Sequence, residues 1–320
     1  MARHVKREAP TDPAFGCRPE NRPLEEYLQW GVVPLDKPSG PTSRAACDMV
    51  GRLLGVDRTG HGGTLDPRVT GVLPVLLGHS TRVAGVLLGC DKAYVGTMLL
   101  HGDVAPAQLE EGLEQFRGVI EQVPPRRSSV RRRLRRRTVY RFDLVERDGR
   151  AVRFYVECEG GTYIRKLVHD LGEHLGCGAQ MTELRRTEAA GLGVDQCVTT
   201  ERLAEAFGAA RDGHEDSLRR TVLPVERVLS RLLPGVWVDD GAVQSLCTGY
   251  PLTAPGVCAL DDFGAGELVA VMTLKDELIG LGKARADSSA VLAAEAGPIV
   301  SMERVLMDQA AYPKWRREEG

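Results

Sequence analysis

Near the middle of the chain, a strand pattern gives way to a helix pattern within a few residues. Over residues 151–159, apolar and polar side chains alternate, which is typical of a half-buried β-strand. A Gly-Gly pair then turns the chain, and residues 162–175 carry apolar side chains at helical spacing. We expect Thr162 to cap this helix and Arg165 to lie in its first turn, off the apolar stripe. The fold therefore mixes helices and strands.

The first half of the chain shows a related order of elements. Residues 32–35 form an apolar, strand-like run that ends in the turn-rich sequence Asp-Lys-Pro-Ser-Gly-Pro. A helical pattern follows, for which Ser43 is the expected cap and Gly55 the expected stop. A Gly-rich loop over residues 59–67 then leads into a second apolar run.

Length and patterning indicate more than one domain. A chain of 320 residues exceeds the usual size of a single domain. Residues 1–30 are rich in Pro, Arg and Glu without periodicity and are interpreted as an N-terminal extension, and residues 31–230 as the main domain. Residues 235–310 show short strands and turns, including a hairpin turn at Lys275-Asp276-Glu277, and predict a small β-rich domain before a tail at 311–320.

Charge is distributed unevenly along the chain. Residues 236–308 hold eleven acidic and four basic residues, whereas eight arginines crowd into residues 126–137. Guanidinium groups bind phosphate in a bidentate manner, so this cluster favours RNA or DNA as a partner. The alternative interpretation of the cluster is a solvated charged surface.

Several classes of protein are disfavoured by the sequence. No apolar run approaches the roughly 20 residues of a membrane-spanning helix, and the charged N-terminus indicates no export signal, so we expect a cytoplasmic protein. Eight scattered cysteines predict neither a zinc site nor a disulfide framework. The motifs of zinc-dependent base deaminases and of Walker-type hydrolases are missing.

Asp66 is the sharpest candidate for chemistry. It lies between a Gly-rich loop and Pro67, which favours extended backbone at the preceding residue and could present the carboxylate to a ligand. An ordinary loop aspartate that caps a turn is the alternative. The local sequence does not decide between the two.

Four ordered motifs resemble those of one enzyme family. The sequence Gly-Gly-Thr-Leu-Asp-Pro at 62–67, with Thr-Gly-Val-Leu-Pro at 70–74, resembles the signature loop of the TruB-type RNA pseudouridine synthases. Residues 35–43 resemble the preceding structural motif, and Lys-Ala-Tyr-Val-Gly at 92–96 resembles the tyrosine motif. Gly-Thr-Tyr-Ile-Arg at 161–165 and Leu-Arg-Arg at 184–186 are similar to the arginine and leucine motifs. One departure is Val123, where an arginine is commoner in the family.

Within that family, the chain is most similar to the archaeal and eukaryotic dyskerin-type branch. His61, the sequence Leu-His-Gly-Asp-Val at 100–104 and the C-terminal Thr-Leu-Lys-Asp-Glu-Leu at 273–278 carry this similarity. The resemblance implies an α+β catalytic domain with a mixed or antiparallel sheet and a central cleft. It also implies a small β-barrel-like PUA domain that packs with the N-terminal extension.

The resemblance also implies a set of site residues. Asp66 would be the nucleophile, Arg165 the cation that keeps it ionised and oriented, and Tyr94 the ring that stacks on the target uracil. The substrate-binding candidates are His61, Leu184, Lys37, Arg131, Arg132 and Arg133. Without the motifs, Arg165 would be a helix-surface residue, Tyr94 a core aromatic and His61 a hydrogen-bonded loop residue. No metal or cofactor is expected.

The function implied is isomerisation of uridine to pseudouridine. The substrate would be uridine 55 in the T-loop of transfer RNA, ribosomal RNA selected by a box H/ACA guide RNA, or both. Small proteins of the H/ACA ribonucleoprotein would be partners. The alternative is a non-catalytic RNA-binding scaffold, against which Asp66, Tyr94 and Arg165 argue together. The acidic C-terminal domain could hold RNA through its few cations or could serve mainly to pack against the N-terminal extension.

Overall fold

The computed structural model describes residues 3–123 and 133–313 of the chain. These residues form two compact units, one made of residues 31–223 and the other of residues 1–30 together with 224–320. We call them the catalytic unit and the C-terminal unit. The boundary at 223 falls seven residues before the end expected for the main domain, within the short strand β11 (Leu223–Pro224).

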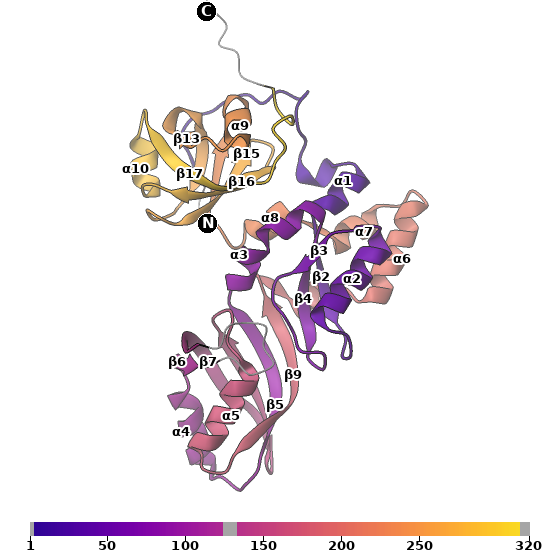
Figure 1. Ribbon diagram of the computed structural model, residues 1–320, viewed down its shortest axis with the longest axis vertical. Coiled ribbons are helices and arrows are strands. Elements are labelled where there is room, and N and C mark those ends of the chain that lie inside the picture. Colours follow the sequence, from indigo (N-terminus) through magenta and orange to yellow (C-terminus); the bar gives the residue numbers. More distant parts are fainter. Residues whose placement is uncertain (1–2, 124–132, 314–320) are drawn as a thin grey trace, which may run out of the picture. The chain divides into compact units, whose positions relative to one another are not determined.

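A long, twisted mixed sheet forms the framework of the catalytic unit (Figure 1). Its path runs β2-β4-β9-β5-β8-β7-β6, with β3 paired to β4 and β10 to β9. Neighbours pair antiparallel except for a short parallel pairing of β4 with β9. The bounds of the strands are β2 Gly31–Lys37, β3 Thr59–His61, β4 Thr70–Leu77, β5 Lys92–Leu100, β6 Gly118–Gln122, β7 Arg135–Asp148, β8 Ala151–Cys158, β9 Ala179–Ala189 and β10 Leu192–Gly193.

Helices pack against three strands of this sheet. Helix α5 packs on β9, α4 on β7 and α2 on β4, and α6 packs on both α2 and α7. Residues at the centres of β2 and β4, such as Val33 and Leu76, are fully buried. The helices of the unit are α2 Ser43–Leu54, α3 Ala84–Gly89, α4 Pro106–Gln115, α5 Ile164–His174, α6 Thr200–Arg211 and α7 Asp216–Thr221, with 3-10 turns η2 Gly78–Val83 and η3 Val194–Gln196.

The C-terminal unit is built on a second, strongly curved sheet with the order β1-β14-β12-β15-β16-β17-β13 (Figure 1). Strand β1 comes from the N-terminal segment and pairs antiparallel with β14, so the first residues of the chain belong to this sheet. The strands are β1 Arg3–Val5, β12 Gly235–Val238, β13 Leu252–Thr253, β14 Val257–Asp261, β15 Leu268–Thr273, β16 Leu278–Ala284 and β17 Pro298–Val305. The helices are α1 Leu24–Gln29, α8 Val225–Leu229, α9 Asp240–Cys247 and α10 Ser288–Ala293, with 3-10 turns η1 Pro19–Asn21 and η4 Ala254–Gly256.

The expected fold class, α+β with a mixed sheet, is confirmed, and so is the hairpin between β15 and β16. Gly55 ends α2 in the left-handed conformation, as expected (φ 69°). Both expected helix caps are wrong by one position. Thr42, not Ser43, caps α2. Tyr163, not Thr162, is the residue before α5, and the Thr162 hydroxyl donates to the carbonyl of Glu159.

Candidate active site

Asp66 and Arg165, which are 99 positions apart in the sequence, meet as an ion pair. Asp66 lies in the loop between β3 and β4, and Arg165 is the second residue of α5. Arg165 Nη2 donates to Asp66 Oδ2, and the two side chains keep 51% (Asp66) and 60% (Arg165) of their surface exposed. The guanidinium therefore orients a carboxylate that a substrate can still reach.

Residues of α2 and of the turn before it form hydrogen bonds with the backbone of the Asp66 loop. Ser43 Oγ accepts from the amide of Leu65 (2.7 Å) and donates to the carbonyl of the same residue (3.0 Å). The amide of Gly40 donates to the carbonyl of Pro67 (2.8 Å). Because Gly40 has a φ of 117°, this turn favours glycine there. The turn-rich motif thus supports the loop that carries Asp66.

Lys37 lies under the same loop and is fully buried. Its Nζ donates to the carbonyls of Pro38 (2.9 Å), Pro67 (3.1 Å) and Val69 (2.9 Å), which uses all three of its donors. Burial lowers the pKa of Lys37. Direct contact with RNA stays a prediction for this residue, and its geometry favours support of the Asp66 loop instead.

Tyr94 is buried on β5, with 6% of its surface exposed. Its register partner on β9 is Arg186, whose guanidinium contacts the phenol. Burial raises the pKa of Tyr94, and the Arg186 guanidinium opposes that shift. The phenol is thus neutral and held in place beside the Asp66 loop, whose Gly63 also contacts Arg186.

His61 and Leu184 lie on strands next to these residues. His61 ends β3, is half-buried, and accepts at Nδ1 from the amide of Gly63 (3.4 Å). Burial lowers the pKa of His61, and the Arg186 charge lowers it further, so the ring is neutral near pH 7. Leu184 is half-buried on β9, opposite Gly96 of β5. A side chain at Gly96 would collide with Leu184 and Phe154, which accounts for the glycine.

The arginine cluster is described in part. Arg131 and Arg132 lie outside the described residues, and Arg133 is exposed just before β7. On β7 itself, Arg136 pairs with Glu121 and Arg137 with Glu159, both at 3.1 Å. Part of the positive charge on β7 is therefore neutralised within the protein.

The cations expected to serve the C-terminal unit are largely engaged as well. Lys275 donates to the carbonyls of Asp12 and Phe15, and Arg285 donates to Ser301 Oγ (2.7 Å). Lys283 is exposed. Two of these three cations thus hold the unit together.

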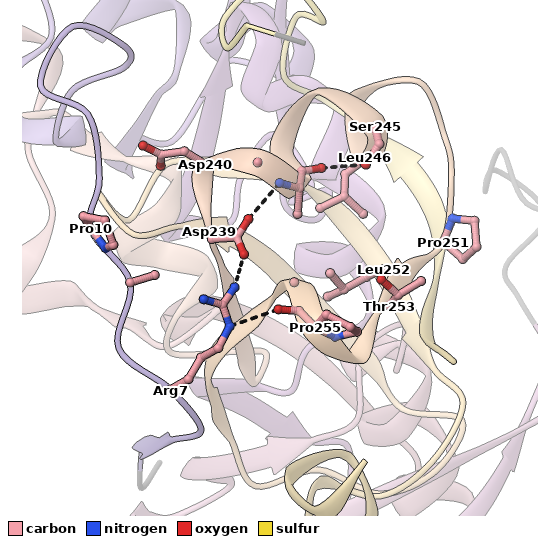
Figure 2. A pocket seen from close by; sticks show the side chains of 14 residues that line it. Arg7, Pro10, Asp239, Asp240, Ser245, Leu246, Pro251, Leu252, Thr253 and Pro255 are labelled. Carbon is pink, nitrogen blue, oxygen red and sulfur yellow. Dashed lines mark hydrogen bonds and ion pairs between the residues drawn. The ribbon is translucent and has the colours of Figure 1, made fainter. Parts of the chain in front are cut away.

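A cavity of about 430 Å³ opens in the C-terminal unit, between the N-terminal segment, α9 and the loop that follows it (Figure 2). Asp239 in its wall pairs with Arg7 and accepts from the amide of Ala242 (2.9 Å). Asp240 accepts from the hydroxyl of Thr11 (3.0 Å). Both carboxylates are therefore satisfied by the protein, and the cavity contains none of the expected catalytic residues.

Sequence reasoning missed one central residue, Arg186. It was noted only as part of a motif, yet it is fully buried and contacts both Tyr94 and the Asp66 loop. The available signal was the pair of glycines at 63 and 71, since both leave room for it.

Models of known families match nearly the whole chain. The TruB family pseudouridylate synthase N-terminal domain matches residues 51–164, and the tRNA pseudouridylate synthase B C-terminal domain matches 165–230. The PUA domain matches residues 234–306, and the DKCLD domain matches 2–45. Within the part of the chain that the structure describes, no helix is long and apolar enough to cross a membrane.

Relatives and solved structures agree over almost their full lengths. "Probable tRNA pseudouridine synthase B" of Methanopyrus kandleri is 46% identical over 97% of this chain and 92% of its own. The protein of the same name from Methanothermobacter thermautotrophicus is 45% identical over 99% and 98%. A chain in a Cbf5-Nop10-Gar1 complex superposes with a TM-score of 0.90 at 43% identity, covering 98% of this chain and 96% of that one. An H/ACA ribonucleoprotein bound to a substrate RNA gives 0.89 at 42% identity, with the same coverage. The chain belongs to the TruB family, in its dyskerin-type branch, and is a pseudouridine synthase.

Proposed function

We propose that Asp66 is the nucleophile with which this chain converts uridine to pseudouridine in RNA. The observation that carries the proposal is the ion pair of Asp66 with Arg165 on an exposed loop. An oriented carboxylate that remains accessible is what a covalent step on a bulky polymer requires.

The reaction is an isomerisation, so a carboxylate suffices for it. The bond between ribose C1′ and uracil N1 breaks, a bond between C1′ and C5 forms, the C5 proton leaves and N1 gains a proton. Attack by Asp66 on the ribose and attack on the uracil ring both satisfy this balance. Neither route transfers electrons to an external acceptor.

The target uridine must leave its stack before it reaches Asp66. Unstacking costs on the order of a few kcal/mol, which contacts in the pocket must offset. Tyr94, Leu184 and His61 lie on the strands around the Asp66 loop, and we assign them to this pocket. The Tyr94 ring would stack on the uracil, Leu184 would form an apolar wall, and neutral His61 would contact the flipped nucleotide. Arg131, Arg132 and Arg133 would contact phosphates outside the pocket.

Two substrates follow from the relatives. Curated relatives are named tRNA pseudouridine synthases, which supports uridine 55 of the transfer RNA T-loop as a target. Solved relatives are in complexes with Nop10, Gar1 and a substrate RNA, which supports guided modification of ribosomal RNA with small partner proteins. We propose both, in the cytoplasm. Purified protein assayed on a transfer RNA transcript, with and without guide RNA and partner proteins, separates the two activities.

Substitution of Asp66 tests the catalytic assignment. Asp66→Asn keeps the size of the side chain but removes the nucleophile, so we expect no pseudouridine above background and RNA affinity within about threefold of wild type. Asp57→Asn, at an exposed aspartate of the same unit, is the matched control and should retain turnover. Turnover by Asp66→Asn would refute the role of Asp66. Wild-type protein that binds both RNAs and modifies neither would favour the non-catalytic scaffold.

A further inference from the structure

Arg186 is a fully buried arginine, and among the residues that the structure describes its guanidinium pairs with no carboxylate. Burial lowers its pKa, and the charges that oppose this shift come from Tyr94 and Cys197. Its guanidinium donates to two backbone carbonyls and contacts the Tyr94 phenol. A buried cation costs free energy unless its donors are used, so these three contacts account for its place in the fold.

The two carbonyls lie on either side of Asp66, one near the start of its loop and one in β4, the strand that follows the loop. Arg186 Nη2 donates to the carbonyl of Gly63 (3.0 Å), three residues before Asp66. Arg186 Nε donates to the carbonyl of Val72 (2.7 Å), six residues after it. One rigid, planar group therefore joins the start of the loop to the strand that follows it.

The third contact reaches the other side of the site. Tyr94 and Arg186 are register partners on β5 and β9, and the guanidinium contacts the phenol. The same side chain thus connects the loop of the nucleophile to the ring assigned to the uracil.

Two glycines make room for this arrangement. Gly63 has a φ of 141°, and a Cβ there would lie 3.3 Å from Arg186 Nη1 and 3.0 Å from Lys92 Cε. Gly71 has a φ of 100° and pairs directly with Arg186 across β4 and β9, where a Cβ would lie 2.1 Å from the Arg186 carbonyl oxygen. Any larger residue would push the loop away from β9, so the glycines and Arg186 form one unit of structure.

We propose that Arg186 is a positioning residue for pseudouridine formation, which sets the Asp66 loop at a fixed place relative to Tyr94. The inference rests on the roles proposed for Asp66 and Tyr94. Arg186 has no exposed surface, so it acts through these residues and does not touch RNA.

Arg186→Lys is the informative variant. Lysine keeps the charge but carries its donors on a single nitrogen at the end of a flexible side chain. It therefore cannot contact both carbonyls and the Tyr94 phenol in one fixed geometry. A displacement of about 1 Å can cost about 100-fold in rate, so we expect the single-turnover rate at saturating RNA to fall about 100-fold. RNA affinity should stay within about threefold, because the phosphate contacts are unchanged.

Coupling to Tyr94 separates positioning from general stability. Tyr94→Phe removes the hydroxyl and keeps the ring, so Arg186→Lys should cost several-fold less in a Tyr94→Phe background than in wild type. Arg147→Lys is the matched control, since Arg147 also donates to two backbone carbonyls, those of Gly149 (2.9 Å) and Val104 (2.7 Å). It should leave the single-turnover rate unchanged.

The outcomes distinguish this inference from the proposed function. If wild type is active, Asp66→Asn is inactive and Arg186→Lys turns over like wild type, the positioning role is wrong and the catalytic assignment stands. Equal costs of Arg186→Lys in both backgrounds would also overturn it. If Arg186→Lys does not fold, Tyr94→Phe alone decides: we expect a rate at least about tenfold lower with unchanged RNA affinity, and a wild-type rate would refute the proposal.

Discussion

The two units use buried charge in opposite ways. In the catalytic unit, Lys37, Lys92 and Arg186 are buried and donate to backbone carbonyls. In the C-terminal unit, Arg22 and Glu226 are buried against each other, with hydrogen bonds of 2.7 and 3.2 Å. In the first arrangement Lys37 and Arg186 hold the Asp66 loop and Lys92 holds the end of α3. In the second, a counter-charge neutralises the buried group, and the pair holds distant segments together. Buried charge therefore serves geometry in one unit and assembly in the other.

A second buried acid in the C-terminal unit also joins distant segments, in this case through neutral donors. Glu277 accepts from the amide of Cys17 (3.1 Å), the hydroxyl of Thr273 (3.1 Å) and the phenol of Tyr312 (2.7 Å). Three segments far apart in the sequence thus meet at one carboxylate. Glu226 likewise accepts from the amide of Leu278 (3.3 Å) in addition to Arg22.

The largest effect on stability is expected from breaking the buried ion pair of Arg22 with Glu226. Arg22→Met leaves Glu226 buried without its counter-charge, which should lower the free energy of unfolding by about 3–5 kcal/mol. Urea unfolding of the full chain measures this loss. Replacing both partners, as Arg22→Met with Glu226→Leu, should recover most of it, because no buried charge is left unpaired. A double variant as unstable as the single one would contradict this account.

Removing Lys37 tests whether the catalytic unit uses its cations for geometry. Lys37→Met removes the ammonium donor from the carbonyls of Pro67 and Val69 and leaves Pro67 only the Gly40 amide, so the Asp66 loop should shift and the single-turnover rate should fall about 100-fold. Lys92→Met is the matched control, since Lys92 donates to the carbonyls of Leu87, Leu88 and Cys90 around the end of α3. It should lose stability with a smaller loss of rate. Equal losses of rate in the two variants would show that Lys37 is not specific to the loop.

The pairing of Asp66 with Arg165 was predicted better than the residues that support their loop. The α+β fold and the family follow from motifs and are confirmed. The meeting of Asp66 with Arg165 followed from the resemblance alone, because no local pattern links residues 99 positions apart. The roles of the substrate-binding candidates stay predictions.

The residues that support the loop could not be predicted, because they are charged side chains that are fully buried, which is rare. A lysine before Pro-Ser-Gly is expected at the surface, yet Lys37 is fully buried. Alternation alone does not say which of two adjacent arginines faces the interior, and Arg186 is fully buried whereas Arg185 is half-buried. Arg185 instead forms a bidentate pair with Asp36 at 2.8 and 2.9 Å.

The smallest effect is a pH dependence of stability carried by Lys92. Burial lowers the pKa of Lys92 from 10.5 to about 8, so between these values the folded chain binds fewer protons than the unfolded chain. Stability must therefore rise with pH across this window, and the cost of burying the cation is fully present below about pH 8. The neighbouring thiol of Cys158 does not interfere, since burial raises its pKa to about 12.

Lys92→Met lacks this titration, so the free energy of unfolding of wild type minus that of the variant should increase by on the order of 2 kcal/mol from pH 8 to 10.5. A difference that stays constant over this range would mean that Lys92 keeps its charge throughout. The contrast between the units would then be sharper still, because a buried lysine of the catalytic unit would be held charged by carbonyls alone.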